Sequence, residues 1–322
     1  MKPVCAWNDP AARDQLVTRL VNDAITILNA LDGVDLDDNQ AQLAGLLALV
    51  AGQDVEPDPD GPDGSWRIER GVAKHRVIST VDPQSRHMHK SRSVYRDGYK
   101  AHIAVEPDTG IITACDLTPA NAADGAAGVG LLAEEPAGLE VLGDSAYGSG
   151  DTLAELHAAG HRPVIKPWSV PKNPRLGNDQ FNRDDFVFDY NARTVTCPNG
   201  VTKHISVNGR VTFGVSCRGC PVRDRCTAAA GGKKLYVTEH DQFLAANRAR
   251  WDDDDQLVAD YKQHRPHVER GVAHLVANNH RRVRFRGVEP NKLGLSLRAS
   301  AINLRRLVNL GLSHNGNTWN IS

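Results

Sequence analysis

The chain has 322 residues, of which 40% are hydrophobic and 24% are charged, and its formal net charge is −1. These values are typical of two globular units, or of one fold with a large insertion, and they exclude a chain that is disordered throughout. No stretch approaches the roughly 18 apolar residues that span a bilayer, and the N-terminal residues lack the apolar segment of a secretory signal. We therefore expect a cytoplasmic protein that does not cross a membrane.

Residues 1–66 are predicted to form a helical segment that ends in an acidic linker. Asp9 and Pro10 are typical of a helix start, with an N-cap followed by proline in the first turn. Apolar residues then recur at helical spacing, and a second helix is expected over residues 39–51. Residues 53–65 are rich in Asp, Pro and Gly, which indicates a linker.

Residues 67–167 are predicted to form the first part of a mixed α/β core. In chain order the expected elements are strands at 76–81, 99–105 and 111–117, a helix at 121–135, a strand at 139–144, a helix at 151–159 and a strand at 161–167. The alternation of strands and helices favours an α/β fold.

The remaining chain divides into an insertion and a second helical part. Residues 168–240 alternate short strand-like pieces with Pro, Gly and Cys, which indicates a Cys-rich insertion. Residues 241–322 are predicted to complete the core with a long helix and a last helix over 294–310. Pro266 should kink or restart the long helix near Arg265.

Asp144 is the first candidate for a catalytic residue. It ends an apolar strand and opens into a turn that contains Gly148 and Gly150. Carboxylates at the end of a buried strand stand where α/β folds place their chemistry. The alternative is a structural aspartate that caps the helix expected from Asp151.

Glu269 is the second candidate. Tyr261, Arg265 and Glu269 are four residues apart, so they share one face of a helix. Such a stripe could hold a metal ion and a phosphate together. The alternative is an ordinary surface pair between an arginine and a glutamate.

Four of the six cysteines, Cys197, Cys217, Cys220 and Cys226, gather in the insertion. In a reducing compartment this spacing favours a metal site over disulfides. Four thiolates can complete a closed, structural Zn²⁺ site. The insertion has few large apolar residues, so a metal ion would also explain how it folds. The alternative is four reduced cysteines without a metal.

Two basic segments could bind DNA. Residues 281–306 carry many arginines, including Arg281, Arg282, Arg284 and Arg286, against Glu289 alone. A second segment, rich in histidine, leads to Lys100. Contacts to phosphates are the simplest use of both segments. The alternatives are solvated surfaces or, for the histidines, a metal site.

Several motifs together resemble DDE-class insertion-sequence transposases. They are the segments STVDPQSRH at 79–87, DGYKAH at 97–102, GDSAYG at 143–148, the cysteine cluster, and RPHVER at 265–270. The resemblance covers residues 2 to about 310, and the motifs occur in the family's order.

The resemblance implies an RNase H-like fold, a mixed sheet flanked by helices, and a DNA strand transferase. In this family two aspartates and a glutamate bind two divalent ions, Mg²⁺ or Mn²⁺, which activate the nucleophile and stabilise the leaving oxygen. The second aspartate corresponds to Asp144 and the glutamate to Glu269, while Arg265 would contact DNA. The implied partners are transposon ends, target DNA and further copies of the full-length chain, in a nucleoid-associated protein of the bacterial cytoplasm.

The sequence departs from the family at its first aspartate. No Asp-Ser-Thr or Asp-Gly-Thr signature precedes Tyr99, and residues 2–10 resemble a segment that follows this signature in longer relatives. We therefore expect a chain without the first strand, the first aspartate and the N-terminal DNA-binding helices. Asp82 is the nearest substitute, and His274 is the nearest match to a basic residue that often follows the glutamate.

Three hypotheses about function follow from the sequence. The chain could be an active transposase, or an inactive remnant that still binds DNA through its arginine-rich C-terminal region. It could also be a structural or regulatory protein stabilised by zinc. The spatial relation of Asp144 to Glu269 and to a third carboxylate discriminates between them.

Overall fold

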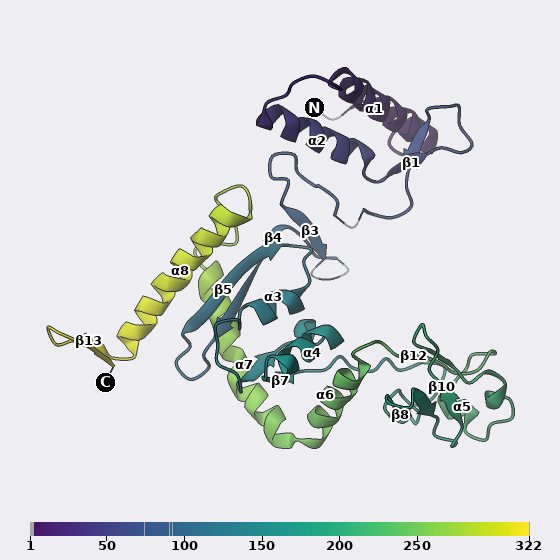
Figure 1. The fold of residues 1–322 in the computed structure, drawn as a ribbon, viewed down its shortest axis with the longest axis vertical. Helices are drawn as coiled ribbons and strands as arrows, with labels where there is room; N and C mark the ends of the chain where they lie inside the picture. The colour runs from purple at the N-terminus through teal and green to yellow at the C-terminus, as the bar shows by residue number, and fades with distance from the viewer. Residues whose placement is uncertain (1–2, 74, 90, 92, 322) are drawn as a thin grey trace. The chain divides into compact units, whose positions relative to one another are not determined.

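The computed structural model describes residues 3–73, 75–89, 91 and 93–321 (Figure 1). The described chain forms two compact units. The first contains the chain up to Ala101 together with residues 117–122 and 279–297, and the second contains residues 102–116, 123–278 and the chain from Arg298 onward. Both units therefore draw on segments that lie far apart in the sequence. The four sequence segments proposed above stay predictions.

The first unit begins with two helices and a short hairpin, α1 Pro10–Ala30, α2 Asp38–Gly52, β1 Val55–Pro57 and β2 Trp66–Ile68. The Asp9 side chain caps α1 by accepting from the Ala11 amide, with Pro10 in the first turn as predicted. Asp37 and Gln40 form a capping box at the start of α2. The expected linker over 53–65 instead contains β1, which pairs antiparallel with β2.

The prediction of a strand at 76–81 is wrong, because these residues form no strand in the structure. Val77 is nevertheless buried. The Gln53 side chain accepts from the Val77 amide and donates to the Val77 carbonyl, both at 2.9 Å. An amide side chain thus replaces the neighbouring strand that the apolar pattern of this segment had suggested.

A three-stranded sheet follows, with strand order β3-β4-β5. Its strands are β3 Arg86–His89, β4 Tyr95–Val105 and β5 Ile112–Pro119. The strands expected at 99–105 and 111–117 are therefore present, although β4 begins earlier, at Tyr95. The early residues of β4 pair antiparallel with β3, from Arg86 opposite Gly98 to His89 opposite Tyr95.

The second unit contains a βαβ arrangement whose first strand ends just before the candidate carboxylate Asp144. Its elements are the helix α3 Asp124–Gly130, the strand β6 Glu140–Gly143, the 3-10 turn η1 Ser145–Tyr147, the helix α4 Gly150–Ala158 and the strand β7 Arg162–Ile165. The strands β6 and β7 are parallel neighbours. Leu153 and Leu156 of α4 pack against Ile165 in a buried cluster. The predicted helix over 121–135 is confirmed only in α3, a segment with three glycines.

The mixed α/β character is confirmed, but the single RNase H-like sheet is not seen in the described residues. There β6 and β7 form a sheet of their own, separate from β3-β4-β5. The RNase H-like topology therefore remains an expectation from the family resemblance.

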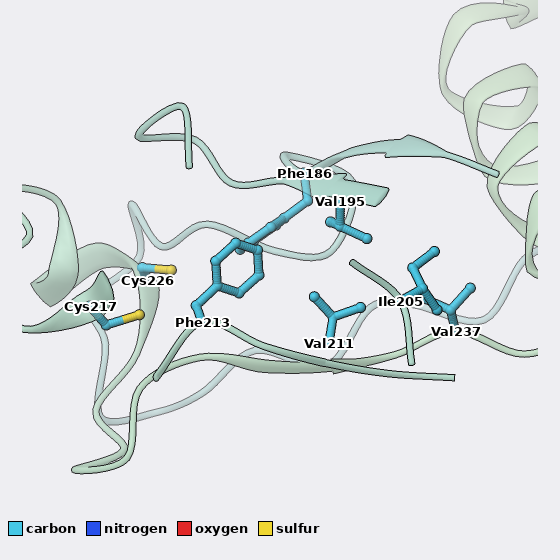
Figure 2. Packing of buried hydrophobic residues seen from close by; sticks show 8 residues of the cluster. All are labelled: Phe186, Val195, Ile205, Val211, Phe213, Cys217, Cys226 and Val237. Carbon is cyan, nitrogen blue, oxygen red and sulfur yellow. The ribbon is translucent and has the colours of Figure 1, made fainter. Parts of the chain in front are cut away.

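The Cys-rich segment has its own apolar core, which the sequence interpretation missed. Its elements are β8 Val187–Asp189, β9 Thr194–Thr196, β10 Thr202–His204, β11 Arg210–Thr212, η2 Gly214–Cys217, α5 Arg223–Cys226 and β12 Lys234–Tyr236. The Phe186 and Phe213 rings lie 5.7 Å apart and pack with buried valines, next to Cys217 and Cys226 (Figure 2). The segment therefore has large apolar residues that pack together, so the argument that it lacks them was wrong.

The chain ends in helices α6 Asp241–Asp253, α7 Asp255–Val276 and α8 Val288–Asn309 and the hairpin strands β13 Leu312–His314 and β14 Trp319–Ile321. Pro266 lies inside α7, and the helix continues through it instead of restarting at Arg265. The last helix begins at Val288, ahead of the expected Gly294. Among the residues described, no helix is both long and apolar enough to cross a bilayer.

Candidate functional site

Asp144 follows β6 directly and has two interactions. One carboxylate oxygen accepts from the Ala146 amide at 3.0 Å and so caps the turn η1. The other oxygen lies 3.2 Å from Nη2 of Arg265 on α7. The helix α4 is capped by Ser149 instead, whose hydroxyl accepts from the Thr152 amide. Asp144 is therefore not the cap of that helix, and one of its oxygens faces α7.

Arg265 brings the two candidate carboxylates together. Its Nη1 atom lies 3.7 Å from the nearer carboxylate oxygen of Glu269, one turn further along α7. The Arg265 side chain is 18% exposed, whereas those of Asp144 and Glu269 are 48% and 69% exposed. One guanidinium in a shielded position thus contacts two carboxylates that are open to solvent. The contact between Arg265 and Glu269 fits the surface pair that was the alternative for Glu269, so a role of Glu269 as a metal ligand stays a prediction.

Tyr261 completes the stripe that helical spacing predicted on α7. Burial raises the pKa of the Tyr261 hydroxyl, while the Arg265 guanidinium next to it lowers that pKa. Arg265 therefore interacts with both Tyr261 and Glu269, one turn before and one turn after it.

Tyr147 and His102 also lie at the site. Sequence reasoning named His102 only as part of the histidine-rich segment and did not single out Tyr147. Burial raises the pKa of Tyr147 to about 12, and the carboxylates of Asp124 and Asp144 favour the same direction. The Tyr147 hydroxyl lies 3.3 Å from Nδ1 of the buried His102. A side chain at Gly128 would meet the Tyr147 ring at 2.6 Å. Tyr147 lies in the motif GDSAYG and His102 in the motif DGYKAH, so these motifs could have indicated that both residues belong to the site.

The two carboxylates suit a hard divalent cation. Carboxylate oxygens are the ligands that Mg²⁺ prefers, and Mg²⁺ sites often use one or two carboxylates together with water and substrate phosphates. Asp144 and Glu269 already share one positive group in Arg265. Within the described residues, however, no group of three or more His, Cys, Asp or Glu side chains is arranged to hold a metal ion.

Asp82, the nearest substitute for a first aspartate, is engaged within the first unit. The Tyr99 hydroxyl lies within 2.8 Å of both of its carboxylate oxygens. The Gly287 amide donates to the same side chain at 3.2 Å. Asp82 therefore has a structural role, because its hydrogen bonds connect the residue before α8 to the segment before β3.

The four clustered cysteines are reduced and line one cavity of about 20 Å³. Cys217 and Cys226 are buried, and the Lys233 amide lies 3.4 Å from the sulfur of Cys217. Burial raises the pKa of the Cys226 thiol. The cysteines therefore converge, but within the described chain they do not form a metal-binding group. The expectation of one zinc coordination shell is not met by this geometry.

The candidate DNA-binding residues have different surroundings. The Lys100 ammonium donates to the Ala122 carbonyl at 2.8 Å. The loop before α8 is braced by Asn291, whose side chain donates to the carbonyls of Phe285 and Gly287 and accepts from the Phe285 amide. This loop presents four exposed arginines, Arg281, Arg282, Arg284 and Arg286.

Comparison with known proteins gives one match. The family model described as a transposase DDE domain matches residues 66–304, which is well over half of the chain. No curated protein matches, and no solved structure matches. The matched range contains Asp144, Arg265, Glu269 and the four clustered cysteines.

Proposed function

Because the chain belongs to the family of DDE transposases, we propose that it acts on DNA in transposition, with Asp144 and Glu269 as ligands of Mg²⁺ or Mn²⁺. The observation that supports this proposal most is the position of Arg265 between the two carboxylates, at 3.2 and 3.7 Å. The residue that follows β6 and a residue of α7, far apart in the sequence, thereby contact the same positive charge.

Each residue at the site would have a different role in strand transfer. A bound divalent ion supplies activation of the attacking oxygen and neutralises charge on the phosphate. Asp144 and Glu269 would hold the ion, and the cap on η1 fixes the direction of the Asp144 carboxylate. Arg265 offers a planar donor that can bind a phosphate through two hydrogen bonds. The exposed arginines before α8 would hold the DNA backbone.

Binding of Mn²⁺ tests the carboxylate site directly. Mn²⁺ has a magnetic resonance signal when free, so titration of the protein gives its affinity without an activity assay. We expect Asp144→Asn and Glu269→Gln each to weaken Mn²⁺ binding by about tenfold or more, because each removes one anionic ligand. Asp151→Asn is the matched control, since the Asp151 side chain is 83% exposed on the neighbouring helix α4. Equal affinities in all four proteins would refute the site.

DNA binding without strand transfer is a second candidate function. Two carboxylates meet at Arg265, whereas the family resemblance implies three. With one ligand fewer, the repulsion between two cations is less well compensated, so at least one should bind weakly. We expect this chain to bind DNA carrying the element's ends but not to cut or join it with Mg²⁺ or Mn²⁺. Metal-dependent cutting that Asp144→Asn abolishes would instead establish the active enzyme.

Zinc at Cys197, Cys217, Cys220 and Cys226 remains a proposal for the Cys-rich segment. It is supported by the convergence of the four cysteines on one cavity and by the amide that approaches the Cys217 sulfur. Zn–S bonds of about 2.3 Å would require the sulfurs to draw closer around the ion. We expect purified protein to contain one zinc ion, which is released when the thiols are titrated. Protein without zinc and with four freely reacting thiols would contradict the proposal.

A further inference from the structure

The hairpin of β3 and β4 carries a group of aromatic rings on one exposed face. The register places His87 opposite Asp97 and His89 opposite Tyr95. Residues opposite each other, and residues two apart in a strand, project from the same face of a sheet. All four side chains are exposed to solvent. The face is therefore aromatic and open to solvent.

The rings of this face hold one another in place. His87 stacks on Tyr95 with a centroid distance of 5.3 Å and an angle of 20° between the rings. His89 meets Tyr95 edge-on at 4.6 Å. The Nδ1 atom of His87 lies 2.6 Å from the Asp97 carboxylate. These contacts fix the rings relative to each other without covering them, so the face is organised before any ligand arrives.

The sequence around the rings is rich in basic residues. Residues 86–100 contain five Lys and Arg residues, and Asp97 is their single acidic residue. Arg96 pairs with Met88, so it projects from the opposite face of the hairpin and leaves the aromatic face free of its side chain. Exposed aromatic rings within a basic segment match the chemistry of an unpaired nucleotide, which has a base that can stack and a phosphate that is negative.

We propose that the face formed by His87, His89 and Tyr95 binds an unpaired nucleotide of DNA by base stacking. Bases inside a duplex are stacked on their neighbours and cannot offer a free ring surface, so the ligand is single-stranded or frayed DNA. Within the described residues these side chains do not form a metal-binding group. The site needs neither Asp144 nor a metal ion.

The test compares single-stranded and duplex DNA of one sequence that contains 2-aminopurine, whose fluorescence falls when it stacks. We expect the wild-type protein to quench the single strand and to bind it more tightly than the duplex. Tyr95→Leu should weaken single-strand binding by about tenfold or more, because one stacked base is lost. The slope of log affinity against log salt should stay unchanged, because no phosphate contact is removed.

Three further variants separate stacking from other causes. Tyr95→Phe keeps the ring and should keep wild-type affinity. His89→Leu leaves the bond between His87 and Asp97 intact and should also weaken single-strand binding. Tyr236→Leu removes an exposed tyrosine from a different hairpin and should have no effect. Wild-type affinity in both Tyr95→Leu and His89→Leu, or equal binding of single strand and duplex by the wild type, would overturn the proposal.

Discussion

Arg265 is the residue on which the candidate site depends. Its guanidinium occupies the space between two carboxylates that a divalent cation would also seek. A metal ion and this guanidinium therefore compete for the same negative charge, because like charges repel strongly at such short range. Once a metal ion neutralises the carboxylates, the guanidinium becomes available to a phosphate.

Replacement of Arg265 should move metal and DNA affinity in opposite directions. We expect Arg265→Gln to bind Mn²⁺ more tightly, by about tenfold or less because solvent screens the exposed carboxylates. DNA should bind less tightly, because one phosphate donor is lost. Magnetic resonance of free Mn²⁺ and fluorescence anisotropy of labelled DNA give the two affinities.

Arg270→Gln is the control for this experiment. It removes the same charge from an exposed position on α7, whereas the ion pairs of Asp144 and Glu269 across the site are with Arg265. Weaker Mn²⁺ binding in Arg265→Gln than in Arg270→Gln would mean that the guanidinium supports the metal ion instead of competing with it.

Some individual residues could be read from the sequence and others could not. Asp9 and Pro10 act at the start of α1, so the rules for helix caps were sufficient to interpret them. Tyr261, Arg265 and Glu269 lie along α7, so helical periodicity was sufficient to place them on one face. The neighbours Tyr147 and His102 meet across different elements, and no local pattern links them.

At the scale of elements, the junction between the Cys-rich segment and α6 depends on a buried carboxylate. Asp241, the first residue of α6, is 4% exposed. It accepts from Arg183 at 2.6 Å and from the Tyr190 hydroxyl at 2.8 Å. Burial and this carboxylate together raise the pKa of Tyr190. The Cys-rich segment is thereby fastened to the helix that follows it.

Loss of this carboxylate should destabilise the protein. Asp241→Ala removes the carboxylate that pairs with the largely buried Arg183, which should lower the free energy of unfolding by about 2–3 kcal/mol. Asp179→Ala breaks an ion pair with Arg225, but the Asp179 side chain is 84% exposed. That variant should lose less than about 1 kcal/mol. Urea denaturation followed by circular dichroism measures both, and equal losses would contradict the role given to Asp241.

Elements were predicted well where local signals agree and poorly where tertiary contacts decide. The capping of α1 and the apolar runs of β6 and β7 marked those elements correctly. The apolar residues at 76–81 predicted a strand, but Gln53 satisfies the backbone of Val77 instead. In α7, the helix tolerates Pro266 and continues through it, which the local rule for proline did not anticipate.

On the scale of the whole molecule, the family and the α/β class followed from motifs in order along the chain. The arrangement of strands could not be predicted in this way, because pairing between strands depends on contacts that span long stretches of sequence. The motifs predict that Asp144 and Glu269 converge on a metal ion, and in the structure both carboxylates contact Arg265. Their catalytic role stays a prediction until metal binding is measured.

DNA binding should be dominated by charge. Arg284 lies in the exposed loop that Asn291 braces. We expect Arg284→Gln to weaken binding of all DNA sequences alike and to reduce the slope of log affinity against log salt by about one. Arg19→Gln, which removes an exposed arginine from α1, should leave the slope unchanged. Identical slopes in wild type and Arg284→Gln would exclude this loop as a phosphate contact.

The bond between Asn247 and Ile165 has a consequence for how such a chain can change in evolution. The Asn247 side chain, on α6, donates to the carbonyl of Ile165, the last residue of β7, at 2.9 Å. The polypeptide thus leaves the core at β7, forms the Cys-rich segment with its separate apolar core, and returns beside its point of departure. Such a detour can lengthen, shrink or be exchanged for another while the two carboxylates keep their separation in space.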